Sequence, residues 1–314
     1  MSLLGRQAAP VTRPGARPAE RELPEAARLR PNWPGCRGNR GEILRVCSNP
    51  ACGRGRLRFW RTQQTPVFQG GWCCSKECTL ARARLAVSRE MEGWGVANNR
   101  FHRLPLGLAM LEAGWITQAD LRAALTAQRA AGGGRLGQWL VRQGKASEDE
   151  VTRALGMQWS CPVLGAELTC PEGLAALVPR LFVDACGVLP LRVAADRILY
   201  LGFEERPDPS LSLAAERITG LRVASGVVRE SFFRPAHRRM LEAEFPAVEL
   251  VEAASESAAA ATLASSIERV RPVEARLARV HDCLWMRMWL GLQRGPLPEP
   301  GSILDQIVAF ARRE

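Results

Sequence analysis

Four cysteines in the first third of the chain have the side chains and the spacing of metal ligands. They form two close pairs separated by 21 residues, and they are Cys47, Cys52, Cys74 and Cys78. A tetrahedral Zn²⁺ site with four sulfur ligands needs this arrangement and leaves no open position for a substrate. We therefore expect a structural zinc ion rather than a zinc hydrolase. Cys36 and Cys73 remain alternative ligands, and buried thiols without a metal are the other interpretation.

The other residues with chemical potential do not form a catalytic constellation. Four cysteines stand alone among apolar neighbours and are expected in the core, namely Cys161, Cys170, Cys186 and Cys283. The three histidines are scattered, and His281 beside Asp282 is typical of a polar hairpin turn. Neither His-Glu-x-x-His nor Gly-x-Ser-x-Gly occurs, and neither Lys76 nor Lys145 completes a P-loop. The sequence therefore predicts a protein that is not an enzyme.

An internal repeat of 30 residues begins the middle of the chain, with copies at 105–128 and 135–158. Each copy predicts a helix, a glycine stop and a second helix with an N-terminal capping residue. The matched positions, first copy and then second, are Leu106 and Leu136, Gly107 and Gly137, Met110 and Leu140, Gly114 and Gly144, Thr117 and Ser147, Leu121 and Val151, Leu125 and Leu155, and Gln128 and Gln158. Two helical hairpins in tandem follow from this pattern.

The segment from Gly70 to Cys78 resembles the second knuckle of treble-clef zinc fingers of the MYM/FCS kind. In the family's Phe-Cys-Ser-x-x-Cys motif, Cys73 takes the aromatic place and Cys74 takes the ligand place. The first knuckle departs from the family, because four residues separate Cys47 from Cys52 where two are usual. The resemblance implies a zinc site with four cysteine ligands.

The tandem repeat and the residues after it, 101–246, resemble the N-terminal domain of type II secretion and type IV pilus assembly ATPases. The family repeat reads R-L-G-x-x-L-x-x-x-G-x-x-x-x-x-x-L-x-x-x-L-x-x-Q, twice in tandem. The second copy matches it from Arg135 to Gln158, whereas the first copy has Pro105 in the place of the arginine. The ATPase core of that family is not expected here, because no P-loop is present.

In some members of that family the tandem repeat binds cyclic di-GMP, and in others the domain docks onto a membrane platform or a partner protein. Arginine can pair with guanine or stack on it, and a glycine at a helix start lets N–H groups approach a phosphate. The resemblance implies a cyclic-dinucleotide site formed by Arg135, Leu136, Gly137, Leu140, Gly144 and Gln158 of the second copy and by Leu106, Gly107 and Gln128 of the first. Packing of two helical hairpins needs many of the same residues and is the alternative.

The net charge of +11 lies entirely in the first hundred residues, which hold 18 basic and seven acidic side chains. The rest of the chain has 25 of each. A basic segment with aromatic residues suits nucleic acid. The candidate contacts are Arg54, Arg56, Arg58, Phe59, Trp60 and Arg61. Nucleic-acid binding through residues 1–100 is therefore a second hypothesis, and solvated surface arginines are the alternative.

Composition and periodicity divide the chain into four parts and predict a mixed α+β fold. We expect a disordered Arg/Pro-rich tail at 1–34, a zinc module at 35–100, two helical hairpins followed by a small α/β domain at 101–246, and a short αβ extension at 247–314. The α/β domain is expected to contain helices at Glu172–Leu181, Leu211–Thr219 and Glu230–Leu241 and strands at Gly187–Val193, Ile198–Phe203 and Leu221–Val228. The extension is expected to contain a helix, a β-hairpin at Val273–Trp289 and an amphipathic C-terminal helix at Ile303–Arg313.

The absence of a run of 18 apolar residues and of a signal peptide predicts a cytoplasmic protein without a membrane span. We expect a non-catalytic regulatory or adaptor protein. Its partners would be cyclic di-GMP, a secretion- or pilus-type assembly protein, or another protein.

Overall fold

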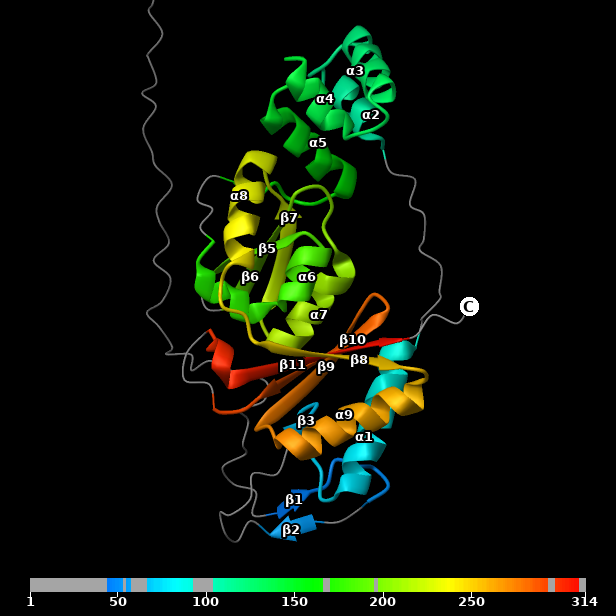
Figure 1. Cartoon of the computed structure of the whole chain (residues 1–314), viewed down its shortest axis with the longest axis vertical. Helices are drawn as coiled ribbons and strands as arrows, with labels where there is room; N and C mark the ends of the chain where they lie inside the picture. The colour runs from blue at the N-terminus through cyan, green and yellow to red at the C-terminus, as the bar shows by residue number, and fades with distance from the viewer. Residues whose placement is uncertain are drawn as a thin grey trace, which may run out of the picture. The chain divides into compact units, whose positions relative to one another are not determined.

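The computed structural model of the chain describes residues 44–52, 55–57, 67–92, 104–165, 170–194, 197–292 and 297–310 (Figure 1). These residues combine helices with three β-sheets, which confirms the α+β class. The expected tail at 1–34, Cys36, and the arginine and aromatic side chains between 54 and 61 lie outside what the structure describes. No helix in the described part of the chain is both long enough and apolar enough to cross a membrane.

The tandem repeat forms two helical hairpins, as the sequence predicts. Its helices are α2 (Leu106–Glu112), α3 (Gln118–Ala130), α4 (Leu136–Arg142) and α5 (Glu148–Trp159). Each first helix ends at a glycine in the left-handed region, with φ of +72° at Gly114 and +65° at Gly144. Each second helix begins with a capping box, at Thr117 and at Ser147. Glycine stops and capping residues therefore set the lengths of these helices.

A small α/β unit with a three-stranded sheet follows the repeat. Its elements are the 3₁₀ helix η1 (Glu172–Leu177), α6 (Arg180–Ala185), β5 (Val188–Ala194), β6 (Ile198–Phe203), α7 (Pro209–Thr219), β7 (Arg222–Val227) and α8 (Glu230–Leu241). Strand β6 pairs antiparallel with β5 and parallel with β7, and α7 connects the two parallel strands. The prediction of a single helix at Glu172–Leu181 is wrong, because the helical conformation is interrupted between η1 and α6. Pro179 lacks an N–H and favours the extended conformation seen at Val178.

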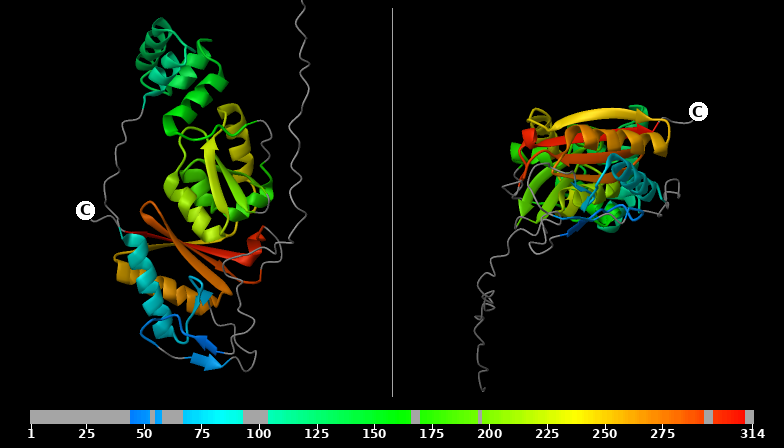
Figure 2. Two further views of the ribbon diagram at one scale, coloured as in Figure 1. Left: turned by 180° about the vertical axis from the view of Figure 1, so that it is seen from behind. Right: turned by 90° about the horizontal axis from the view of Figure 1, so that it is seen from below.

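A six-stranded sheet joins two segments that are far apart in the sequence (Figures 1 and 2). Its order is β4-β3-β9-β10-β11-β8, and the strands are β3 (Val67–Phe68), β4 (Gly71–Trp72), β8 (Ala247–Ala253), β9 (Glu274–Val280), β10 (Cys283–Trp289) and β11 (Ile303–Phe310). Strand β3 runs parallel to β9, with Phe68 beside Ala275. The Cys-rich segment and the C-terminal residues therefore share one sheet, although the sequence places them in separate parts. The antiparallel pair β1 (Leu44–Val46) and β2 (Gly55–Leu57) forms a separate sheet.

The central strands of this sheet, β9, β10 and β11, are buried on both faces. Helices α1 (Lys76–Met91) and α9 (Glu256–Val270) lie side by side on one face (Figure 2). The other face packs against the α/β unit, where the ring of Trp285 meets that of Phe182 edge-on at 5.7 Å. Successive side chains of a strand point to opposite faces, so Leu284 and Met286 join the first layer while Trp285 joins the second. Such a doubly buried strand has a nearly continuous run of apolar residues.

The C-terminal amphipathic helix expected at Ile303–Arg313 is wrong, because Ile303–Phe310 forms strand β11 between β10 and β8. Ile303 and Ile307 face the α/β unit, and Val308 faces α9. A spacing of four residues fits a helical stripe and equally fits one face of a strand. Only pairing with the two neighbouring strands distinguishes these structures. The hairpin expected at Val273–Trp289 is confirmed as β9 and β10.

Gly226 in β7 allows the segment that follows α5 to pack closely against this strand. A Cβ atom at Gly226 would lie 2.4 Å from the carbonyl oxygen of Pro162, which accepts a hydrogen bond from Val227. We expect Gly226→Ala to destabilise the protein by about 1–3 kcal/mol, because this backbone cannot move aside freely. Urea denaturation measures the effect. Gly173→Ala is the matched control, with no atom within 4 Å of its added Cβ and an expected change below about 0.5 kcal/mol. Equal midpoints for the two variants would contradict the prediction.

Candidate functional site

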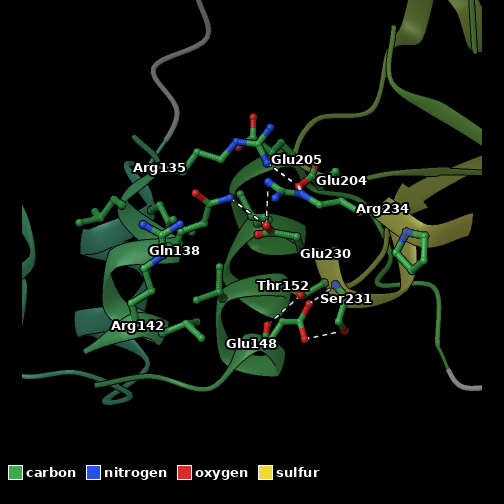
Figure 3. Close-up of a pocket in the computed structure, with 17 residues that line it drawn as sticks. Arg135, Gln138, Arg142, Glu148, Thr152, Glu204, Glu205, Glu230, Ser231 and Arg234 are labelled. Atoms are coloured by element: carbon green, nitrogen blue, oxygen red, sulfur yellow. Dashed lines mark hydrogen bonds and ion pairs between the residues drawn. The ribbon is translucent and has the colours of Figure 1, made fainter. Parts of the chain in front are cut away.

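A pocket lies beside the second copy of the repeat, where α4 and α5 meet α8 and the residues that follow β6 (Figure 3). Its volume is about 520 Å³, and ligand-binding pockets usually measure about 300–1,000 Å³. The lining residues are Leu106, Arg135, Leu136, Gly137, Gln138, Val141, Arg142, Glu148, Val151, Thr152, Leu155, Glu204, Glu205, Glu230, Ser231, Arg234 and Pro235. The three residues that open the second copy of the repeat thus lie in the wall of this pocket.

Aliphatic side chains on helix faces form the apolar part of the wall. Val151 and Leu155 are four residues apart on α5 and therefore lie on the same face of that helix. Gly137 lets α4 approach this face closely, since a Cβ atom there would lie 2.6 Å from Cγ1 of Val151. The repeat pattern therefore produces an apolar surface and a close helix contact at the same place.

Arginines and carboxylates form an ion-pair network in the pocket. Arg135 Nη1 lies 2.6 Å from Glu204 Oε1, and Arg135 Nε lies 2.5 Å from Glu205 Oε1. Arg234 contacts Glu204 at 3.1 Å and Glu230 at 2.7 Å. Burial lowers the pKa of Arg135, but the neighbouring carboxylates outweigh it and raise the pKa above its usual value. Arg135 therefore stays charged, and the network joins α4 to the α/β unit.

Two further contacts connect the repeat to the start of α8 (Figure 3). Glu148 accepts hydrogen bonds from the backbone N–H of Ser231 at 2.6 Å and from its hydroxyl at 2.7 Å. Gln138 Nε2 donates to Glu230 Oε1 at 2.9 Å. The guanidinium of Arg142 lies 5.6 Å from the ring centroid of Trp139 and forms no ion pair with a described residue. Arg142 is therefore the lining arginine whose charge is least compensated.

The structure brings four of the nine expected dinucleotide-site residues to the pocket, namely Leu106, Arg135, Leu136 and Gly137. The other five occupy positions outside its lining. Leu140 is fully buried in the repeat core, Gly107 packs against Leu121, Gly144 ends α4, Gln128 donates to the carbonyl oxygen of Gly134 at 2.6 Å, and Gln158 lies in the last turn of α5. The second copy thus supplies most of the repeat's contribution to the pocket.

Most of the charged residues that line the pocket carry no signal in the sequence that marks them as part of a site. Arg142 lies seven residues after Arg135, so helical periodicity puts both on one side of α4. Glu204, Glu230 and Arg234 carry no such signal, because they reach the pocket through the packing of α8 and of the residues after β6 against the repeat.

The four cysteines expected as metal ligands also come together. The sulfur atoms of Cys47, Cys52, Cys74 and Cys78 all lie within 4.8 Å of one another. The Cys52 and Cys74 sulfurs are 3.4 Å apart, and those of Cys74 and Cys78 are 3.7 Å apart. Cys73 lies outside this group, and its sulfur is 3.6 Å from the Ser48 hydroxyl. The geometry therefore favours Cys74 over Cys73 as a ligand.

Hydrogen bonds around this cluster prepare one thiol for ionisation. Asn49 Nδ2 donates to the sulfur of Cys78 at 3.3 Å. That hydrogen bond is the main cause of a pKa of Cys78 below its usual value. A hydrogen bond with Cys52 is the main cause that raises the pKa of Cys74. Four sulfurs with such a supporting amide are a donor set that suits Zn²⁺.

Solved structures of other proteins are similar to part of this chain. No family model matches it, and no curated protein matches it. A structure of MshE with cdg is similar at 24% identity and a TM-score of 0.33, covering 44% of this chain and 99% of that one. The N-terminal domain of XpsE is similar at 22% identity and a TM-score of 0.30, covering 43% of this chain and 92% of that one. Both likenesses cover less than half of this chain.

Proposed function

We propose that this chain is a non-catalytic regulatory or adaptor protein whose pocket binds a cyclic dinucleotide of the cyclic di-GMP class. The observation that carries the proposal is the position of Arg135, Leu136 and Gly137 in the wall of a pocket of about 520 Å³. The same triplet opens the repeat copy that resembles the cyclic di-GMP-binding repeat of secretion and pilus assembly ATPases. The repeat pattern and the pocket lining thus have this triplet in common.

The apolar and cationic groups of the pocket suit the two parts of such a ligand. Val151 and Leu155 provide a surface on which a flat purine can lie, excluding water from its faces. Arg142 has a guanidinium without a carboxylate partner among the described residues, and arginine forms strong bidentate hydrogen bonds with phosphate. We therefore propose that the phosphate of the ligand binds at Arg142 and that its base lies on the aliphatic surface of Val151 and Leu155.

The carboxylates of the pocket supply a basis for choosing guanine. Guanine has a donor, its N2 amino group, as well as the acceptors O6 and N7. Glu205 or Glu230 would accept from the amino group, and Arg135 would donate to O6 and N7. Adenine lacks the O6 acceptor, so a cyclic di-AMP ligand would leave Arg135 without that partner.

Ligand binding would also exchange partners within the ion-pair network. Arg135 now pairs with both Glu204 and Glu205, and contact with a guanine would require it to leave at least one of them. Since those carboxylates follow β6, the exchange would alter how α4 is held by the α/β unit. Ligand binding in the pocket would thereby change how the protein binds a partner protein. The resemblance indicates a secretion- or pilus-type assembly protein as the class of that partner.

We also propose that the four-cysteine cluster holds a structural Zn²⁺ ion. A Zn²⁺ ion bound by these four thiols, which lie within 4.8 Å of one another, would have no open coordination position for a substrate. The ion would connect the loop after β1 to the start of α1, which carries Cys78. Since α1 packs on the six-stranded sheet, the metal would stabilise that sheet indirectly.

Calorimetric titration of cyclic di-GMP into the zinc-loaded full chain tests the proposed ligand. We expect saturable binding, and we expect Arg135→Ala to weaken it by roughly 10- to 100-fold. A charge-assisted hydrogen bond contributes about 1.5–3 kcal/mol, which corresponds to that range. Arg135→Lys should weaken binding too, because lysine cannot form the bidentate contact. Cyclic di-AMP should bind less tightly than cyclic di-GMP.

Arg229→Ala is the matched control for this titration. Arg229 forms an ion pair with Asp149 beside the same helices but does not line the pocket. We expect its affinity to stay within about twofold of the unmodified chain, since such exposed pairs contribute little. No binding by the unmodified chain, or equal affinities for the Arg135 and Arg229 variants, would overturn the proposal.

A further inference from the structure

Cys186, Asp208 and His281 lie together in space although they come from three separate elements. Their ligand atoms, one sulfur, one carboxylate oxygen and one imidazole nitrogen, all lie within 4.8 Å of one another. Cys186 follows the last residue of α6, Asp208 precedes the first residue of α7, and His281 lies in the turn between β9 and β10. No part of the function proposed above uses these residues.

The backbone holds two of these side chains in fixed positions. Asp208 caps α7, and its Oδ1 accepts from the N–H of Leu211 at 3.1 Å, so its Oδ2 is turned toward His281. His281 has a φ of +51°, which few residues with a side chain adopt. Its own N–H donates to the Ser210 hydroxyl at 2.9 Å, and its Nε2 lies 2.5 Å from Asp208 Oδ2. These contacts hold the imidazole nitrogen of His281 directly against the carboxylate oxygen of Asp208.

We propose that Cys186, Asp208 and His281 form a second divalent transition-metal site of the Zn²⁺ class. Zn²⁺ binds thiolate, imidazole and carboxylate at about 2.0–2.3 Å, so two ligands of one ion lie within about 4.6 Å of each other. Mg²⁺ and Ca²⁺ take oxygen ligands, and a sulfur ligand disfavours both. The side chain of His281 is 56% exposed, so solvent reaches the site. Three protein ligands leave the fourth position for water or an external ligand.

The carboxylate of Asp208 lies beside the Cys186 sulfur and the His281 imidazole, with the three ligand atoms within 4.8 Å of one another. A divalent ion held by these groups would be the dominant local charge and would offset the negative charges of a carboxylate and a thiolate. With one thiolate instead of four, this site would bind zinc less tightly than the four-cysteine cluster.

A bound ion would link the α/β unit to the six-stranded sheet. Cys186 and Asp208 belong to the α/β unit, and His281 belongs to the turn of the β9–β10 hairpin. Among the described residues, the hydrogen bonds of His281 with Asp208 and with Ser210 already connect these elements. The metal would reinforce that connection, and an exchangeable metal would make its strength depend on metal supply.

Metal stoichiometry of the full chain tests this inference. We expect two Co²⁺ ions per chain by equilibrium dialysis, and visible absorption from thiolate-bound Co²⁺ at the second site after the four-cysteine cluster is filled with Zn²⁺. His281→Asn should lose one ion per chain, and Cys186→Ser should also lose the absorption. Asparagine tolerates the left-handed conformation, so His281→Asn keeps the turn.

Cys170→Ser is the matched control, because Cys170 is also half-buried but donates to the carbonyl oxygen of Pro190 and lies outside the cluster. It should retain two ions. One ion in the unmodified chain and still one in His281→Asn would overturn the inference and leave the four-cysteine site intact. If the unmodified chain binds one ion, and if His281→Asn loses that ion while Cys78→Ser keeps it, the result would support this inference and contradict the four-cysteine proposal.

Discussion

Replacement of Cys78 by serine is expected to remove one zinc ion per chain and to loosen α1. Cys78 is buried at the start of α1 and is the thiol that Asn49 stabilises as a thiolate, so it is the ligand most ready to bind. Structural zinc contributes an apparent 10–16 kcal/mol or so to folding in zinc-finger peptides. Here the packing of α1 on α9 retains part of the structure, and we expect a loss of several kcal/mol.

Metal analysis and amide hydrogen exchange of α1 check this expectation. Exchange at Ala83 and Val87, which face the sheet, should accelerate in Cys78→Ser. Cys73→Ser is the matched control, because Cys73 is equally buried but bonds to Ser48 and lies outside the cluster. It should keep its zinc and its protection. Equal zinc content in the two variants would show that the four thiols do not act as one site.

Loss of the Asp305 carboxylate is expected to lower the free energy of unfolding by a large amount. Asp305 is fully buried and accepts hydrogen bonds from Trp285 Nε1 at 2.9 Å and from Arg287 Nε and Nη2 at 2.8 Å each. Arg287 also donates to the carbonyl oxygen of Leu177 at 3.0 Å, which ties the sheet to the α/β unit. We expect Asp305→Ala to cost about 3–5 kcal/mol, because it leaves a buried guanidinium without its counter-charge. The free energy of unfolding in urea measures this cost.

Two comparison variants separate the buried charge from general damage. Arg269→Ala removes an ion pair with Glu249 in which the arginine side chain is 59% exposed, and we expect a loss below about 1 kcal/mol. The double variant Arg287→Met with Asp305→Leu should lose less stability than Asp305→Ala alone, because no buried charge is left unpaired. A larger loss in the double variant would mean that Asp305 acts through its shape rather than its charge.

The helical repeat could be predicted from the sequence because its determinants are local. Gly114 and Gly144 end helices, and Thr117 and Ser147 begin them, through contacts within a few residues. The four cysteines are similar, since the tetrahedral coordination of zinc restricts which spacings are useful. For both features, residue type and short-range spacing carry the information.

The six-stranded sheet and the polar half of the pocket could not be predicted in this way. Strand β11 satisfies a helical pattern and a strand pattern alike, and its pairing with β8 and β10 brings together residues far apart in the chain. Glu204 and Arg234 reach Arg135 only because α8 and the residues after β6 pack against the repeat. Both results depend on contacts between elements.

The helical hairpins, the four-cysteine set and the location of the basic charge follow from the amino-acid sequence, because each depends on residue type and spacing along the chain. The sheet that joins the Cys-rich segment to the C-terminal strands, the pairing of Arg135 with Glu204 and Glu205, and the contact of His281 with Cys186 become visible only in the folded chain. Burial and pairing between distant segments leave no local periodicity in the sequence, so residue spacing cannot predict them.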